Sequence, residues 1–343
     1  MRRLLNTLFV LTEDSYLTLD GENIVILRGE DTLGRFPLHT LESILYFGYR
    51  GASPALMGAC AKRDVALSFL SPNGRFLARV CGESRGNVLL RRRQYRAADD
   101  PSESCRLARG FLIGKVYNCR WVLERATRDH AMRVDVPRLK DVSGSLARTL
   151  REIAECPGAE RLRGLEGEAA SRYFEVFDEL ILQNKEAFRF EGRNRRPPLD
   201  RINALLSFVY TLLAHDCASA LESVGLDSYV GFLHRDRPGR ASLSLDLMEE
   251  LRGAYADRFA VTLINNRKLS PGAFEQRENG AVLLGEAGRK TVISAWQEKK
   301  RETITHPFLE EKMPWGLVPH VQALLLARCL RGDIDEYPPF LWK

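Results

Sequence analysis

The sequence of 343 residues contains seven cysteines but no C-x-x-C pair. Zinc ribbons and thioredoxin-like redox sites need such pairs, so neither kind of site is expected. An odd number of scattered cysteines, most of them beside apolar residues, is typical of reduced thiols in a protein core. The cysteine pattern therefore predicts a cytoplasmic protein.

Long apolar runs are also absent. No stretch approaches the roughly 20 apolar residues that a membrane-spanning helix needs. The N-terminal stretch MRRLLNTLFVL is short, and TEDSY follows it in place of the small-residue cleavage site of a signal peptide. We therefore expect a first β-strand here and no membrane partner.

Several catalytic fingerprints are missing as well. The sequence has no G-x-x-x-x-G-K-[ST] phosphate loop, no G-x-S-x-G nucleophile elbow, no H-E-x-x-H zinc pair and no G-x-G-x-x-G dinucleotide motif. The enzyme classes that depend on these motifs are therefore not indicated.

The spacing of apolar residues divides the chain into two parts. Residues 1–98 contain short apolar runs typical of strands, with a hairpin expected around Asp20 and Gly21. From about residue 102 onward most segments follow the helical period, and the Asp- and Ser-rich residues 99–104 mark the boundary. We predict an α+β protein with a small N-terminal β-rich domain (1–98) followed by a larger all-α C-terminal domain (102–343).

Basic residues exceed acidic ones moderately, 51 Lys and Arg against 45 Asp and Glu, and many lie in residues 85–98, 185–201 and 288–301. Arginine-rich stretches bind nucleic-acid phosphates, and aromatic neighbours such as Phe188 and Phe190 can stack on bases. The alternative is that each stretch is a solvated surface. The candidate nucleic-acid contacts here are Arg91, Arg92, Arg93, Arg193, Arg195, Arg196 and Lys290.

One carboxylate falls on the apolar face of a predicted helix in residues 163–182. Projected at about 100° per residue, Glu166 lies among Ala169, Tyr173 and Phe177, whereas Glu168 lies on the opposite side. An ionised carboxylate on a packed face is unfavourable unless a cation or hydrogen-bond donors compensate. Glu166 therefore either caps the first helical turn or meets a metal ion, and we favour the metal ion.

A histidine and a short acidic helix offer further ligands. His234 ends an apolar run, and Asp246, Glu249 and Glu250 follow on the next helix. Asp246 and Glu249 are three residues apart and project to one side, while Glu250 is expected to be solvated. Taken singly, the acids fit an ordinary wet helix face and His234 fits a core histidine.

Together these residues suit a particular chemistry. Carboxylates with one imidazole are appropriate ligands for Mn²⁺ or Mg²⁺. Such an ion activates an attacking oxygen and neutralises charge on a reacting phosphate. Beside the arginine-rich stretches, the expected substrate is a nucleic-acid phosphodiester.

Four stretches carry a family resemblance, and they span nearly the whole chain in order: LYFGYRGASPALMGACAKRDVALSFLSPNGRFLARV, LRGLEGEAASRYF, NALLSFVYTLLAHDCASALESVGLDSYVGFLH and SLSLDLMEELR. They closely resemble CRISPR-associated protein one, the integrase of CRISPR spacer acquisition. The resemblance implies an N-terminal β domain that forms homodimers and a helical catalytic domain. It also implies a complex with CRISPR-associated protein two, which captures a short foreign DNA duplex.

The resemblance implies a mechanism and a set of site residues. Each 3′-hydroxyl of the DNA fragment attacks a phosphodiester of the CRISPR repeat in a metal-assisted transesterification. The family's catalytic metal ligands map onto Glu166, His234 and Glu249, with Asp246 as a second acid, and which acid completes the coordination stays open. The link after His234 adds Arg235 and Arg237 as candidate DNA contacts.

Two other functions compete with this one. The chain could be a non-catalytic nucleic-acid-binding scaffold, or a metal phosphodiesterase for small nucleotides that has no need of the arginine-rich stretches. The C-terminal stretch DIDEYPPFLWK fits either a docking tail for protein two or a terminus strapped to its own domain.

Overall fold

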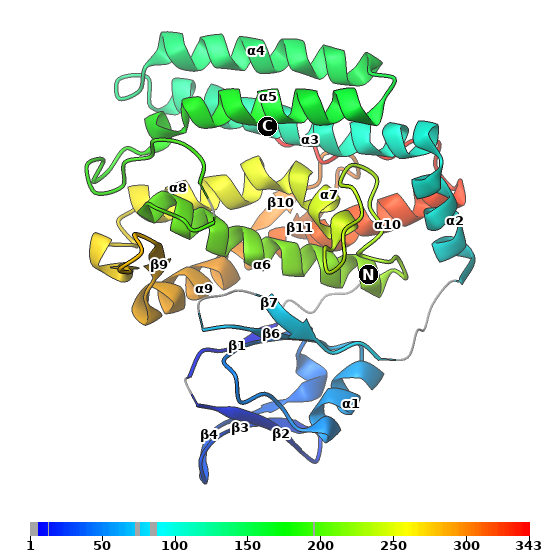
Figure 1. Cartoon of the computed structure of the whole chain (residues 1–343), viewed down its shortest axis with the longest axis vertical. Coiled ribbons are helices and arrows are strands. Elements are labelled where there is room, and N and C mark those ends of the chain that lie inside the picture. The colour runs from blue at the N-terminus through cyan, green and yellow to red at the C-terminus, as the bar shows by residue number, and fades with distance from the viewer. Residues whose placement is uncertain (1–5, 13, 73–75, 83–87, 195) are drawn as a thin grey trace. The chain divides into compact units, whose positions relative to one another are not determined.

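The computed structural model describes residues 6–12, 14–72, 76–82, 88–194 and 196–343. These residues form two units (Figure 1). The first contains the described residues up to 82 together with 286–302 and 315–317, and the second contains the rest. A β-rich N-terminal part followed by a mostly helical part confirms the predicted α+β class.

The first unit contains two sheets. In one sheet three strands run parallel and a fourth, β7, pairs antiparallel with β6: β1 (Thr7–Val10), β5 (Ser43–Phe47), β6 (Ala66–Leu70) and β7 (Phe76–Arg79). The other sheet is an antiparallel meander of β2 (Tyr16–Asp20), β3 (Asn23–Arg28) and β4 (Asp31–Pro37). Helix α1 spans Pro54–Lys62. The hairpin around Gly21 is confirmed, and Gly21 adopts a φ of 58°, which favours glycine.

Apolar side chains from both sheets and from α1 form one buried core, which includes Leu17, Ile24, Ile44, Leu56 and Leu67. Helix α9 (Glu286–Arg301) also belongs to this unit, although it comes late in the chain. Its Lys299 ammonium lies 5.4 Å from the ring centre of Trp315, in the same unit. The sequence predicted one break between domains and no such return.

The boundary between the units also differs from the prediction. Residues 88–98, which we assigned to the first domain, form most of helix α2 (Val88–Asp99) in the second unit. The physical reason is the buried Gln94 amide, which donates to the carbonyl oxygens of Asp227 at 2.7 Å and Val230 at 2.9 Å.

The second unit is built around the long helix α3 (Pro101–Asp129), which packs against α4 (Val136–Glu155), α5 (Ala159–Glu175) and α7 (Ser242–Leu251). Figure 1 shows α3, α4 and α5 side by side. The remaining elements are α6 (Arg201–Ser223), α8 (Arg258–Asn265), α10 (Val318–Arg331), and two short ribbons, β8 (Phe274–Gln276) with β9 (Val282–Leu284) and β10 (Thr303–Thr305) with β11 (Lys312–Pro314).

Local sequence signals explain where these helices begin. Asp100 accepts hydrogen bonds from the backbone of Ser102 and Glu103, and Pro101 occupies the first turn of α3. Asp135 and Asp200 cap α4 and α6 in the same way. Between α3 and α7, a Cβ at Gly114 would stand 2.6 Å from the Cβ of Glu250, so the close approach of these helices requires glycine.

Other sequence expectations have mixed outcomes. All seven cysteines are free thiols and six are buried, as predicted. Among the described residues, one helix, α6, is long and apolar enough to cross a membrane, and 56% of its most apolar window is buried. Phe188 is fully buried and Phe190 is 5% exposed and lines a cavity, so the expectation that they stack on bases stays a prediction for Phe190 and finds no support for Phe188.

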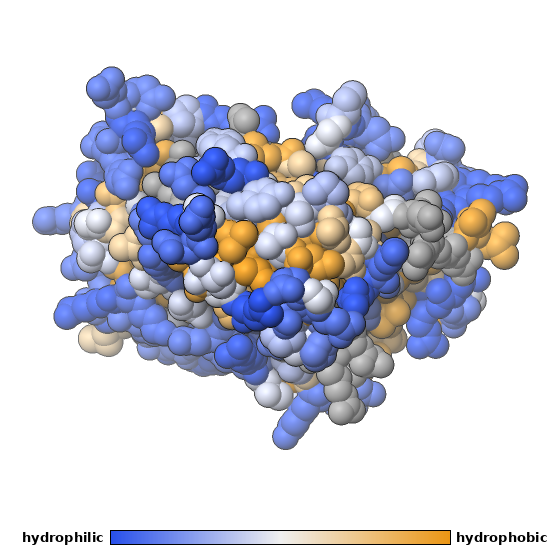
Figure 2. Space-filling model, turned by 90° about the horizontal axis from the view of Figure 1, so that it is seen from below, coloured by the Kyte–Doolittle hydropathy of each residue, from blue (hydrophilic) through white to orange (hydrophobic). Residues whose placement is uncertain are grey.

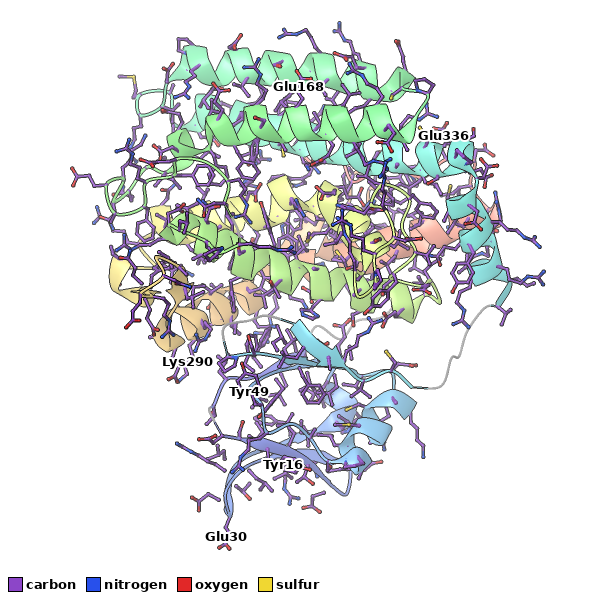
Figure 3. The ribbon with its side chains drawn as sticks, in the orientation of Figure 1. Tyr16, Glu30, Tyr49, Glu168, Lys290 and Glu336 are labelled. Atoms are coloured by element: carbon purple, nitrogen blue, oxygen red, sulfur yellow. The ribbon has the colours of Figure 1, made fainter. Side chains whose placement is uncertain are left out.

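The face drawn in Figure 2 is mostly hydrophilic and also exposes an apolar area. Figure 3 shows Glu30 at the tip of the β3–β4 hairpin and Glu168 on α5. Glu168 is exposed, as the helical projection predicted.

Candidate metal centre

Glu166 and Glu249 converge on one ammonium group. Lys115 on α3 pairs with Glu166 on α5, and its Nζ lies 2.7 Å from Glu249 Oε2 on α7. The side chain of Lys115 is 6% exposed and that of Glu249 is 2% exposed, whereas the side chain of Glu166 is 31% exposed. Glu166 is therefore not a simple helix cap, because its carboxylate is paired to a buried cation.

His234 lies beside the same cluster and is oriented by Asp246. Its Nδ1 is 2.6 Å from Asp246 Oδ1, and its Nε2 is 4.0 Å from Glu249 Oε1. When Nδ1 carries the proton and donates it to Asp246, Nε2 presents its lone pair. This is the geometry in which a histidine binds a metal ion.

The carboxylate of Asp246 has little capacity left for a metal ion. Its Oδ2 accepts the backbone N–H of Phe232 at 2.6 Å and of Leu233 at 3.0 Å, and its Oδ1 accepts the backbone N–H of His234 at 3.1 Å. With the imidazole, this makes four interactions on two oxygens. Asp246 is fully buried, which corrects the alternative of a wet helix face.

Three helices anchor the loop that carries His234. Besides Gln94 on α2, the Ser104 hydroxyl on α3 donates to the Phe232 carbonyl at 2.9 Å. Arg163 on α5 donates to the Leu233 carbonyl at 3.0 Å. Gly231 fits this crowded turn because a Cβ there would stand 2.8 Å from Asp246 Oδ2. The imidazole is therefore positioned by a rigid scaffold.

A π-helical turn (Arg252–Asp257) follows α7 and adds two charged residues. Arg252 Nη2 lies 3.1 Å from Glu249 Oε1, and the Tyr210 hydroxyl donates to Asp257 Oδ1 at 2.5 Å. The extra residue per turn moves these side chains away from the positions that a regular helix would give them. Both therefore face a cavity at the candidate site.

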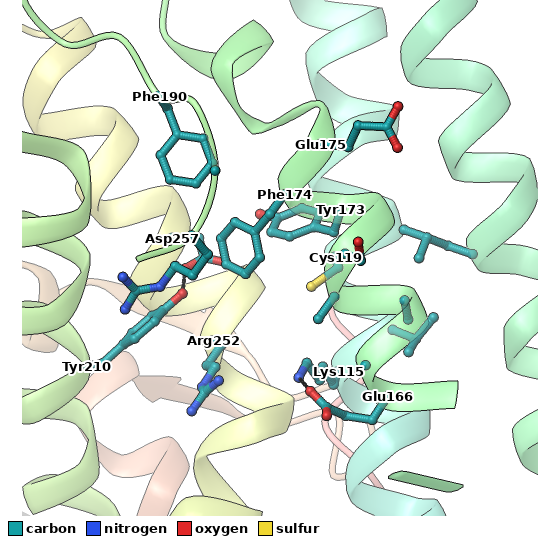
Figure 4. Close-up of a pocket in the computed structure, with 18 of the residues that line it drawn as sticks. Lys115, Cys119, Glu166, Tyr173, Phe174, Glu175, Phe190, Tyr210, Arg252 and Asp257 are labelled. Carbon is teal, nitrogen blue, oxygen red and sulfur yellow. Dashed lines mark hydrogen bonds and ion pairs between the residues drawn. The ribbon is translucent and has the colours of Figure 1, made fainter. Parts of the chain in front are cut away.

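That cavity has a volume of about 680 Å³ and begins at the charged cluster (Figure 4). Lys115, Glu166 and Arg252 line one part of it. The other walls carry the rings of Tyr173, Phe174, Phe190 and Tyr210, together with Arg193 and Asp257. The site thus combines carboxylates, cations and aromatic rings around a space large enough for part of a nucleotide strand.

The charges set the ionisation of the buried acids. Burial opposes ionisation of Glu249, but the positive charges of Arg252 and Lys115 outweigh it and lower its pKa to about 2. Burial raises the pKa of Asp257 to about 6, against the opposing effects of the Tyr210 hydrogen bond and of Arg252. Glu249 is therefore an anion at neutral pH, as a metal ligand must be.

The candidate ligands are of the types that bind a divalent cation. Glu249 lies between the other two candidates: its Oε2 shares the Lys115 ammonium with Glu166, and its Oε1 lies 4.0 Å from the Nε2 of His234. Carboxylates and an imidazole are ligand types that suit Mn²⁺ or Mg²⁺. In the described part of the chain, no group of three His, Cys, Asp or Glu side chains encloses an ion position. The Lys115 ammonium fills the space between the two carboxylates.

The candidate DNA contacts are mostly engaged within the protein. Arg93 forms two hydrogen bonds with Glu103, Arg193 donates to Asn203 Oδ1 at 2.6 Å, Arg235 pairs with Glu160, and Lys290 lies 2.7 Å from Glu286. Lys290 lies on α9 (Figure 3). Three of the candidates, Arg92, Arg196 and Arg237, are exposed and form no ion pair with other described residues. Arg91 is half-buried, and Arg195 lies outside the described residues. The DNA-binding role of this set stays a prediction.

The expectation that Glu250 is solvated is wrong. It is fully buried, because its face of α7 packs against the C-terminal segment. The Tyr337 hydroxyl donates to Oε1, and the backbone N–H of Phe340 donates to Oε2 at 2.8 Å. Asn118 on α3 donates to the Phe340 carbonyl and accepts the N–H of Trp342. The C-terminal segment is therefore strapped to its own unit.

The sequence interpretation missed Lys115, Arg252 and Asp257. A signal for Lys115 was present, since it lies four residues from both Phe111 and Cys119 and so shares their buried stripe. An isolated lysine on an apolar stripe needs a buried anion as its partner. For Arg252 and Asp257 the π-helical turn removed the regular periodicity on which such a signal depends.

Comparisons with known proteins agree with one another. The model of the family described as CRISPR associated protein Cas1 matches residues 8–298. The CRISPR-associated endonuclease Cas1 1 of Chlorobaculum tepidum is 52% identical over 343 residues, which is 100% of both chains.

Two solved structures share the fold. A casposase bound to integration product gives a TM-score of 0.83 at 23% identity, covering 98% of this chain and 94% of that one. A Cas6-RT-Cas1–Cas2 complex gives a TM-score of 0.83 at 22% identity, covering 100% of this chain and 36% of that one.

Proposed function

Because this chain belongs to the Cas1 family, we propose that it is a metal-dependent DNA endonuclease and integrase. The observation that carries the proposal is the position of Glu249, which shares the Lys115 ammonium with Glu166 and lies 4.0 Å from the Nε2 of His234, the imidazole that Asp246 orients. Glu166 also lines a cavity with basic and aromatic walls. The relative from Chlorobaculum tepidum is described as an endonuclease, and the casposase is described with its integration product. Both descriptions support strand cleavage and joining as the reaction class.

In this proposal Glu166, His234 and Glu249 hold Mn²⁺ or Mg²⁺. Glu249, rather than Asp246, supplies the second carboxylate, because the oxygens of Asp246 are already occupied by four donors. The bound ion would polarise the phosphodiester and activate the attacking hydroxyl. Asp246 acts on the histidine and not on the substrate.

The protein's own residues would do the remaining work. Arg252 places positive charge at the cavity beside Glu249, where the reacting phosphate gains negative charge. In the proposed step the 3′-oxygen of a DNA fragment forms a bond to the phosphorus of a CRISPR-repeat phosphodiester, and the bond from that phosphorus to the repeat's own 3′-oxygen breaks. The attacking hydroxyl loses a proton and the leaving oxygen gains one, so the number of phosphodiester bonds is unchanged. The exposed Arg92, Arg196 and Arg237 are suited to sequence-independent phosphate contacts.

The proposed partners are duplex DNA, CRISPR-associated protein two and a second copy of this chain. A structural relative is described as a complex of Cas1 with Cas2, which supports the second partner. The first unit offers a surface for a homodimer: edge strand β4 is largely exposed and presents Leu33 and Phe36 to solvent. The C-terminal segment is not proposed as a docking tail, because it is bound within its own unit.

A strand-transfer assay with labelled DNA fragments and a repeat-containing duplex tests the proposal, with and without protein two. Glu166→Ala, His234→Ala and Glu249→Ala should each lower Mn²⁺-dependent transfer at least 100-fold, whereas DNA binding should stay within a few fold. The matched control is Glu168→Ala, an exposed acid two residues from Glu166 on α5. Transfer that survives EDTA would refute the metal requirement. Equal transfer by the wild type and all four variants would show that these residues do not carry the reaction, and the absence of any transfer above a protein-free control would favour the non-catalytic scaffold.

Neutralising Arg92, Arg196 and Arg237 together distinguishes the remaining alternative. A DNA integrase should lose affinity for duplex DNA and become less sensitive to salt. A phosphodiesterase acting on small nucleotides would keep its full activity in this triple variant.

A further inference from the structure

Lys115 is buried at the point on which the two candidate ligand carboxylates converge. It comes from the middle of α3, and its ammonium contacts Glu166 and Glu249, which come from two other helices. Its side chain is 6% exposed. Gly114, directly before it, lets α3 approach α7 closely enough for this contact.

The ammonium balances charge that would otherwise be unfavourable. Two carboxylates that approach the same largely buried position repel each other, and a cation between them offsets that repulsion. Arg252 reaches Glu249 Oε1 only, whereas Lys115 reaches both Glu249 and Glu166. Lys115 is therefore the cation that holds the pair together in the absence of a metal ion.

A divalent ion bound by these carboxylates needs the same position. Mn²⁺ and Mg²⁺ bind carboxylate oxygens at about 2.1 Å, so an ion shared by Glu166 and Glu249 would stand where the ammonium now stands. Two cations cannot occupy that position together. The lysine has space to leave, since its side chain lines the cavity of about 680 Å³.

We propose that Lys115 is a resident counter-ion of the metal centre, which holds Glu166 and Glu249 in place without the ion and is displaced into the cavity when the ion binds. This inference rests on the proposed function, since it takes the two carboxylates as metal ligands. In the displaced position the ammonium joins Arg193 and Arg252 on the cavity wall. Ion binding thus adds positive charge to the surface that would face the DNA phosphate.

If Lys115 only supported the position of Glu249, its removal would change metal affinity in the opposite direction. If Lys115 only oriented Glu249 as a ligand, its removal would weaken metal binding. If it competes with the ion, its removal strengthens binding while it destabilises the metal-free protein. The sign of the change in affinity therefore separates the two roles without any measurement of catalysis.

The experiment measures Mn²⁺ binding to the DNA-free protein by electron paramagnetic resonance of the unbound ion, together with thermal unfolding. Lys115→Met should bind Mn²⁺ at least tenfold more tightly than the wild type, unfold at a lower temperature without metal, and gain more stability from Mn²⁺. The control is Lys140→Met, which removes a 51% exposed lysine paired with Glu124 on the surface. Lys140→Met should bind Mn²⁺ as the wild type does.

Equal or weaker binding by Lys115→Met would overturn the inference. Glu249→Gln separates this from a failure of the proposed function: if the wild type binds Mn²⁺ no better than Glu249→Gln, the metal centre itself is refuted. Should Lys115→Met not fold, a crystal structure of the wild type with Mn²⁺ decides. Nζ still between the two carboxylates would contradict displacement, and Nζ in the cavity would support it.

Discussion

His234 Nδ1 lies 2.6 Å from Asp246 Oδ1, and the same carboxylate accepts the backbone N–H of His234 at 3.1 Å. Asp246 therefore fixes both the ring and the main chain of the histidine. A buried carboxylate with four donors orients the residue it contacts and has no free position for an ion. This relationship leads to a first prediction about metal binding.

Asp246→Ala should weaken Mn²⁺ binding about 10- to 100-fold, because the imidazole loses the partner that sets its tautomer and orientation. The affinity can be measured by titration of DNA-free protein, and strand transfer should fall in parallel. Asp236→Ala, an exposed acid in the same loop, should change neither. An unchanged Mn²⁺ affinity in Asp246→Ala would contradict the positioning role.

The same loop predicts the effect of adding one methyl group. A Cβ at Gly231 would lie 2.8 Å from Asp246 Oδ2 and 2.8 Å from the Ser242 Cβ, so Gly231→Ala must displace the loop or the start of α7. We expect a loss of about 1–3 kcal/mol in unfolding free energy and a larger loss of metal affinity than of DNA affinity. Gly164→Ala is the control, because nothing lies within 4 Å of its Cβ on α5 and alanine is the better helix former. If Gly231→Ala has the same unfolding free energy and the same Mn²⁺ affinity as the wild type, the loop accommodates the methyl group without cost and the prediction is wrong.

Much of the fold follows from the sequence, because strand and helix periodicity are local properties. The hairpin at Gly21 and the buried face of α5, with Ala169 and Tyr173, are both found where apolar spacing placed them. The late return of α9 to the first unit could not be predicted in this way. Its attachment depends on contacts with residues distant in the chain, such as Lys300 with Thr7.

The site shows a similar limit. The helical projection treats a helix as having one apolar face and one wet face, and on that basis Glu250 was expected to be solvated. In the structure α7 is buried on nearly all sides, so each of its acids needs a partner from another element. Those partners, Lys115 for Glu249 and Tyr337 for Glu250, come from segments far from α7 in the chain. The sequence alone does not show which distant residues contact the acids of α7.

Asp257 predicts a pH dependence of stability. Burial raises its pKa from the ordinary 3.8 to about 6. At a pH between these two pKa values the unfolded chain has released the proton while the folded protein retains it. The free energy of unfolding therefore falls as the pH rises from 3.8 to about 6, and this contribution is constant above about pH 6. The contribution over the full window is about 3 kcal/mol. The free energy of unfolding of Asp257→Asn, relative to that of the wild type, should therefore increase between pH 4.5 and pH 7.5.

Urea unfolding at several pH values measures this difference. Asp99→Asn, which changes an exposed acid, should follow the wild-type curve at a constant offset. Parallel curves for Asp257→Asn and the wild type would mean that Asp257 ionises in the folded protein as it does in the unfolded chain.

The C-terminal strap gives the last prediction. Tyr337 donates its hydroxyl to the buried Glu250, whose pKa burial raises to about 7 despite this hydrogen bond and those from Phe340 and Gln322. Tyr337→Phe removes one donor and leaves the carboxylate less well compensated, so we expect a loss of about 2 kcal/mol at pH 8, where Glu250 is ionised. The loss should be smaller at pH 5.5, where the carboxyl group is protonated. Tyr49→Phe, at a side chain that is 77% exposed, provides the control for removing a hydroxyl. A loss of equal size at both pH values would show that Tyr337 acts through packing and not through the charge of Glu250.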